Sequence, residues 1–164
     1  MGLISDERTA IKSILSAVAG MGTVYSDRHN PNDEKSYKEK FVSGGHVNFA
    51  EIYLGGATEA TDDQMGETSE DDVIQRTKRD NVWFIDLFYG FKYDATTPSE
   101  ITFQNLVEAA ENAFRFSQDL GGKCYKSYPL QRISAGLWQS TGNLVLCHKA
   151  SWTITVRQLI TNTN

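Results

Sequence analysis

The sequence predicts an α+β domain, a mostly antiparallel sheet with two helices packed on one face. Two stretches, residues 73–93 and 144–160, have the two-residue period of strands: the second alternates apolar and polar side chains, and the centre of the first is apolar on both faces. Two others, residues 6–20 and 98–120, carry apolar side chains at helical spacing. The chain has 164 residues, 40% hydrophobic and 23% charged, which is typical of one folded domain spanning residues 1–164.

The expected elements follow one another in the order α-β-β-β-α-β-β. The first helix, residues 6–20, begins at a cap provided by Ser5 or Asp6 and ends at glycines 20 and 22. A short strand at 23–25 and a loop at 26–45 precede a strand at 46–54. Glycines 55 and 56 are expected to end that strand.

The most acidic stretch is residues 58–72, which has no Lys or Arg. Its acidic residues are Glu59, Asp62, Asp63, Glu67, Glu70, Asp71 and Asp72. Such a run usually forms a solvated loop, so we expect a mobile loop that projects from the sheet. A calcium site is the alternative, but the spacing of an EF-hand is absent.

The second half begins with a strand at 73–93 that is apolar on both faces, so we expect it to lie centrally under a helix. Residues 97–100, Thr-Pro-Ser-Glu, resemble a capping box with Pro98 at the first helical position. That helix is expected to end at glycines 121 and 122. A strand around 130–133 and a hairpin turn at 141–143 then lead into the last strand.

The last strand is unusually long. Its 17 residues, 144–160, would reach about 55 Å at 3.3 Å per residue, whereas an ordinary strand has about 5–6 residues. A strand of this length extends past the core of a small domain. It indicates a sheet that bends around neighbouring chains or is continued by them, which is more typical of an assembly subunit than of an enzyme.

No catalytic or cofactor motif is present. The chain has no phosphate loop, no HExxH or GxSxG motif and no clustered metal ligands, so we expect no enzyme, no metal and no organic cofactor. Asp86, within an apolar strand, needs a partner such as Arg132, Lys149 or a neighbouring subunit. His148, on the apolar face of the last strand, is expected to be a core or interface residue.

Composition also limits the cellular setting and the partners. The start of the chain is acidic and has no apolar run, and no segment is long enough to span a membrane, so we expect folding in a cytoplasm. Cys124 and Cys147 are expected to be reduced thiols, although a bridge between them stays open. A net charge of −5 disfavours tight DNA binding.

Several segments together resemble one protein family. They are HVNFAEIYLGG (46–56), VWFIDLFYGF (82–91), EITFQNLVEAAENAF (100–114) and the end of the chain from residue 133 to 160, in which Gly136-Leu137-Trp138 precedes the closing strand. In order and pattern the chain is similar to the tail terminator proteins of long-tailed bacteriophages, the lambda-type minor tail protein U family.

The resemblance implies a structural virion protein of the tail or neck, made in the host cytoplasm. It would form a homo-oligomeric, six-fold ring that caps the tail tube, stops its polymerisation and offers a docking face to the head and neck. Its partners would be the major tail tube protein and a neck or head-completion protein, and DNA would pass through the channel without specific binding.

Two alternatives stay open: another neck or tail-completion adaptor, or a small-ligand-binding α+β domain. For the ring, we expect interface residues on the two long strands and beside the last one: Trp83, Asp86, Tyr89, Trp138, His148 and Trp152. The acidic loop is expected to face the channel or the neighbouring tube ring.

Overall fold

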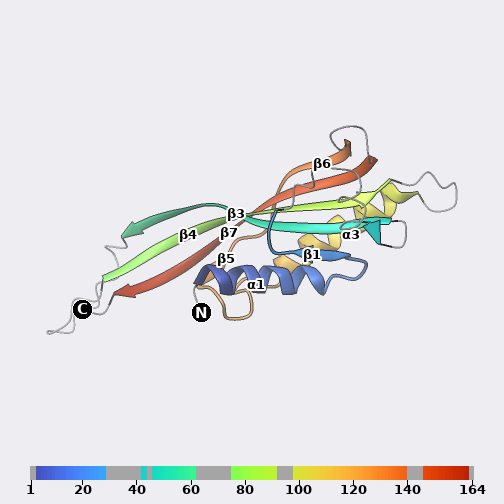
Figure 1. Ribbon diagram of the computed structural model, residues 1–164. Helices are drawn as coiled ribbons and strands as arrows, with labels where there is room; N and C mark the ends of the chain where they lie inside the picture. Colours follow the sequence, from blue (N-terminus) through green and yellow to red (C-terminus); the bar gives the residue numbers. More distant parts are fainter. Residues whose placement is uncertain are drawn as a thin grey trace.

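The computed structural model describes residues 3–28, 42–43, 46–61, 75–91, 98–139 and 146–162. Within them the fold is α+β, with the helices α1 (Leu3–Ser16) and α3 (Ser99–Arg115) beside a curled sheet (Figure 1). The strands are β1 (Thr23–Tyr25), β2 (Val42–Ser43), β3 (His46–Thr61), β4 (Gln75–Gly90), β5 (Lys126–Ser127), β6 (Gln131–Gln139) and β7 (Leu146–Asn162).

The sheet is mixed. Its strands follow the order β1-β3-β4-β7-β5, with β2 paired to β3 and β6 paired to β7. β1 runs parallel to β3, and every other pairing is antiparallel. The predicted element order is therefore wrong by two strands, because β2 and β5 have two residues each and show no periodicity. Alternation along a strand also carries no information on its direction, which is why the parallel pair was missed.

The helix packing differs from the prediction of two helices packed on one face of the sheet, because each helix lies over its own part of the sheet. The backbone of α1 approaches β1 and β3, that of α3 approaches β4 and β7, and the two helices also contact each other. Their apolar side chains join one core cluster with the sheet. Its fully buried members include Ile11 of α1, Ala110 of α3, and Trp83 and Trp152 of the sheet.

The helix boundaries differ from those predicted. α1 begins at Leu3, so Ser5 and Asp6 lie inside the helix and do not cap it. Pro98 precedes α3 with a ψ of 131° and makes no side-chain capping bond, so it is the N-cap residue and no capping box forms. α3 ends at Arg115. Gly121 and Gly122, with φ of 69° and 77°, belong to turns that follow.

Three long strands dominate the sheet. β7 has 17 residues, as predicted, although it runs from 146 to 162, and residues 144–145 lie outside the described part. β3 has 16 residues, because Gly55 and Gly56 form a bulge and do not end the strand. Only glycine fits at position 55, since a Cβ there would lie 2.1 Å from the Phe84 ring.

These strands run past the helices. Beyond the core, Thr58–Thr61 of β3, Gln75–Asp80 of β4 and Arg157–Asn162 of β7 stay paired as a three-stranded ribbon, which we call the arm. Figure 1 shows the arm extending away from both helices, with the C-terminus at its end. The prediction that the sheet extends past its own core is therefore confirmed.

Candidate functional site

The arm is held by strand pairing and by charge pairs between neighbouring strands. Arg157 of β7 binds Asp80 of β4 with two contacts of 2.7 Å each, from Nε and Nη2. This hydrogen bonding holds the pKa of the Asp80 carboxyl below its usual range. Arg79 lies 3.5 Å from Glu59 on β3. The arm is thus an extension of the sheet in which charge pairs join neighbouring strands.

At the other end of the sheet, β6 pairs with the first half of β7 and is exposed to solvent. Every β6 residue is exposed except Trp138, and the exposed fractions of Ile133 and Leu137 reach 58% and 63%. Among the described residues, β6 pairs only with β7, so its outer edge is open. A nine-residue strand with an open edge and two exposed apolar side chains is a template for another strand.

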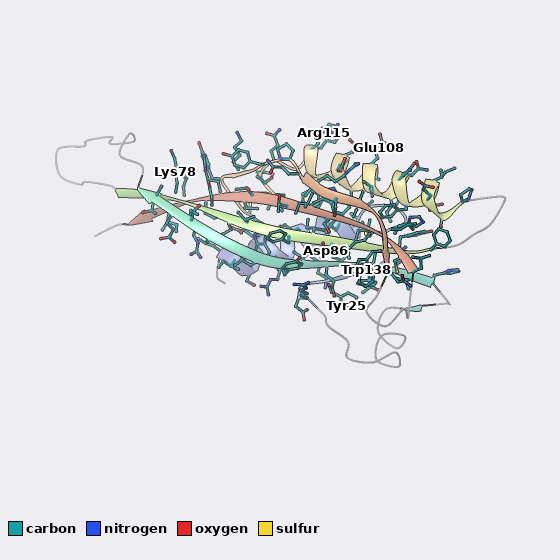
Figure 2. All side chains as sticks on the ribbon, turned by 90° about the horizontal axis from the view of Figure 1, so that it is seen from above. Tyr25, Lys78, Asp86, Glu108, Arg115 and Trp138 are labelled. Atoms are coloured by element: carbon teal, nitrogen blue, oxygen red, sulfur yellow. The ribbon has the colours of Figure 1, made fainter. Side chains whose placement is uncertain are left out.

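Aromatic side chains cover the sheet face opposite the helices at this same end. Phe49 stacks on Phe88 at 4.7 Å, and Tyr25 and Trp138 meet these two rings edge-on. Figure 2 shows Tyr25 and Trp138 at the end of the sheet away from Lys78, which lies on the arm. Trp138 is half-buried in this cluster and Tyr89 is half-buried against the main core. For these two residues an interface role stays a prediction.

Asp86 has the structural partner that the sequence called for. Its carboxylate lies 3.1 Å from Lys149 Nζ and accepts hydrogen bonds from the hydroxyls of Ser151 and Tyr53. Lys149 is thereby confirmed as its partner, whereas Arg132, the other candidate within the chain, binds Glu111 at 2.7 Å. The carboxylate is satisfied within this chain and is only 4% exposed, so it offers little surface to a neighbour.

His148 is buried between α3 and the sheet. Its ring stacks on Phe103 at 5.1 Å, and Nε2 lies 3.0 Å from the Ser99 hydroxyl. Burial lowers the pKa of the imidazole, an effect that the nearby Glu100 carboxylate partly opposes. The histidine is therefore a neutral core residue in this chain, the first of the two roles expected for it.

Trp83 and Trp152 are completely buried, which corrects the expectation that they contact a neighbouring subunit. Each indole N–H donates to a carboxylate on a helix: Trp83 to Glu7 at 2.7 Å, and Trp152 to Glu111 at 2.9 Å. Sequence reasoning missed both acids. Glu7 had a usable signal, because it stands one helical turn before Ile11 and so belongs to the apolar stripe of α1.

The buried Glu7 carboxylate is the most connected polar group of the core. It is fully buried and accepts from Asn81 Nδ2, Trp83 Nε1 and Gln158 Nε2, so it joins α1 to β4 and β7. Its donors are all neutral N–H groups. The arrangement fastens α1 to the sheet where the arm begins.

The acidic segment is placed only in part. Residues 58–61 belong to β3 and not to a loop, and Glu59 is exposed on the arm. Asp62, Asp63, Glu67, Glu70, Asp71 and Asp72 lie outside the described residues. β3 ends and β4 begins at the tip of the arm, so the acidic segment is attached there. Within the described ranges, no group of three or more His, Cys, Asp or Glu residues could hold a metal.

Cys124 and Cys147 form no disulfide in the described part of the chain. Burial, together with the Glu7 and Asp119 carboxylates, raises the pKa of the Cys124 thiol to about 11. Cys124 is therefore a poor nucleophile at neutral pH.

Two hollows lie beside the helices. One, of about 370 Å³, lies between α3 and β6 and is lined by Glu108, Glu111, Arg115, Arg132 and Ala135 among others. The other, of about 420 Å³, lies between α1 and α3 next to Phe116, whose side chain is 85% exposed. Neither contains a nucleophile beside a base, so neither has the arrangement that acyl or phosphoryl transfer needs.

No protein-family model and no curated protein matches this chain. In the ranges that the structure describes, no helix is long and apolar enough to cross a membrane.

Proposed function

We propose that this protein is a structural subunit of a ring, and that the ring is the terminator that caps the tail tube of a long-tailed bacteriophage. One observation carries the first part of the proposal. The sheet continues past its own core as an arm, while β6 leaves an open edge with Ile133 and Leu137 exposed. A monomer would normally protect such features, so a repeated assembly gives them their simplest use.

The position of these features favours a ring over a symmetric dimer. The outer side of the arm at β3 and the outer side of β6 belong to opposite edges of one sheet. Contacts between two different surfaces of the same protein are head-to-tail, and they close into rings or continue as filaments. A terminator ring of six copies is an assembly of the closed kind, and its structural role needs no catalytic residues.

The phage setting rests on the resemblance of the sequence and on charge. A tail terminator contacts the major tail tube protein on one face and a neck or head-completion protein on the other. DNA must pass through it, and a net charge of −5 favours passage over binding. Another neck or tail-completion adaptor would use the same features, and it is the alternative within this class.

A ligand-binding domain is the alternative from a different class. The hollow between α3 and β6 is the observation that favours it, because Arg115 and Arg132 line it together with Glu111. The Arg132–Glu111 ion pair at 2.7 Å already satisfies one of these cations within the chain. A ligand at this site would raise the melting temperature of a monomer, and this result would distinguish a ligand-binding domain from a ring subunit.

Mass measurement tests the proposal directly. Light scattering after size exclusion, with negative-stain images of the same fractions, should show one closed ring of about six chains, either alone or after mixing with purified tail tube protein. A protein that stays monomeric at all concentrations and in that mixture would contradict the proposal. Rings that form but do not bind tube ends would favour the adaptor.

A further inference from the structure

We propose that subunits join by strand addition, with the outer edge of β6 in one copy pairing with the outer edge of β3 on the arm of the next. A continuous sheet would then run around the ring. The β6 edge is Gln131–Gln139, and the β3 edge is Gly55–Thr61, that is, the arm residues of β3 and the three residues before them. This inference rests on the proposed function and names the surfaces that would build the ring.

The backbone groups of β7 show which residues face β6. Phe91 donates its N–H to the carbonyl of Leu146 at 3.1 Å. The backbone N–H and C=O groups of Leu146, and of every second residue after it, therefore point toward β4. Tyr128 donates to the carbonyl of Thr155 at 2.9 Å, which places the odd-numbered residues on the side of β5 and β6.

The register then gives the free groups of β6. Ser134, Gly136 and Trp138 pair with the odd-numbered residues Ser151, Lys149 and Cys147, and so face β7. The N–H and C=O groups of Ala135, Leu137 and Gln139 therefore point outward. In the described part of the chain, no strand lies on that side of β6.

The same alternation applies to the arm. The even-numbered residues of β7 pair with odd-numbered residues of β4, so the backbone groups of the even-numbered β4 residues point toward β3. Among these, Asp80 pairs with Thr58 and Lys78 with Ala60. The N–H and C=O groups of Ala57 and Glu59 consequently point away from the sheet. β1 covers β3 only at residues 49–51, so along the arm this edge is open among the described strands.

A second copy of this chain is the occupant that suits both edges. The edges have similar lengths, and neither contains Lys or Pro, the residues that usually protect an edge. Each carries a single charge, Glu59 on β3 and Arg132 on β6, so pairing of the two edges opposes no like charges. Within the chain Glu59 is paired with Arg79, and Arg132 with Glu111.

The geometry prevents the two edges of one chain from meeting. β6 lies beside the first half of β7, at residues 146–153, whereas the arm contains the last residues of β7. The edges are therefore at opposite ends of the sheet, as Figure 1 shows, and the strand order places them on its two opposite edges. An arm that leaves its own subunit can reach only the β6 of a neighbour.

Cysteine cross-linking tests the pairing. Double variants would carry one cysteine on the arm, at Thr58 or Ala60, and one on β6, at Ser134 or Gly136, with Cys124→Ser to remove the partly exposed native thiol. A Cβ at position 136 meets no atom within 4 Å, so a side chain fits there. Oxidation of assembled protein should give ladders of linked chains up to the full ring, in at least one arm–β6 combination.

Single-cysteine parents and a pair with cysteine at the exposed Glu108 on α3 serve as controls and should give no ladder. Rings without arm–β6 links in any combination would overturn the inference and leave the proposed function standing. Cross-linked dimers from β6 cysteines alone would show a symmetric β6–β6 contact and would also overturn it. Wild-type protein that forms no ring, alone or with tube protein, would refute the proposed function itself.

A backbone variant supplies an independent readout. Ala135→Pro removes an outward N–H and leaves the β6–β7 ladder intact, since proline is tolerated at the free side of an edge strand. Ring formation should be lost at concentrations where wild type is fully assembled, while the melting temperature of the monomer stays unchanged. Ala135→Ser keeps the N–H and should assemble normally; rings formed equally well by both variants would contradict the pairing.

Discussion

The buried Glu7 carboxylate should be one of the most sensitive positions for stability. Its Oε1 accepts from Asn81 and Gln158, and its Oε2 accepts from Asn81 and Trp83, at distances of 2.7–3.0 Å. Glu7→Gln conserves the shape of the side chain but turns one acceptor oxygen into an N–H₂ donor. Whichever oxygen is replaced, two N–H donors then face a donor in a site with no exposed surface.

The cost follows from the two lost bonds. A hydrogen bond to a charged group contributes roughly 1.5–3 kcal/mol, so two of them amount to about 3–6 kcal/mol. The neutral amide also avoids the desolvation cost of a buried carboxylate, which offsets part of this loss. We therefore expect a net destabilisation of about 3 kcal/mol, which for a chain of this length lowers the melting temperature by about 6–12 °C.

Urea unfolding followed by circular dichroism measures this change, at one protein concentration because assembly also contributes to stability. Glu108→Gln, on the exposed side of α3, is the matched control and should change the free energy of unfolding by no more than about 0.5 kcal/mol. If Glu7→Gln were as mild as this control, the four contacts would not carry the energy assigned to them and the reasoning would be refuted.

Two further substitutions test the core. Trp152→Ala should cost roughly 3–5 kcal/mol in urea unfolding, since it empties a fully buried site, and should loosen any ring; Trp138→Ala, at a half-buried site, should cost clearly less. Burial lowers the pKa of His148, so its stabilising contribution is present above the ordinary histidine pKa of about 6.5 and is lost as pH falls below it. His148→Gln should flatten the fall in melting temperature between about pH 7 and 5, and an unchanged slope would contradict this.

Long periodic segments were predicted well because one face of each had to be apolar. The alternation of residues 73–93 and 144–160 located β4 and β7, and the stripes of apolar residues located both helices. Boundaries were less reliable: glycines at 55–56 and 121–122 suggested ends, but Gly55 instead makes room for the Phe84 ring. A glycine in the sequence indicates that the backbone can turn or another group can approach closely, but the packing of the fold decides which of these occurs.

The candidate site was predicted in outline and not in detail. The excess length of the last strand indicated an extension beyond the core, and the arm fulfils that. The sequence also favoured the two tryptophans of the long strands as interface residues, yet both fill the core of the subunit. Hydrophobicity alone cannot separate a residue buried within a chain from one buried between chains, because both remove apolar surface from water.

The sequence by itself determined the α+β class, the two helices, two of the three long strands and the need of Asp86 for a partner. Only the tertiary structure decided the parallel pairing of β1, the clustering of donors around Glu7 and the open edges of β3 and β6. Periodicity is local and reports which side of a segment avoids water. Pairing and edges depend on which distant segments meet, and that is decided by packing over the whole sheet.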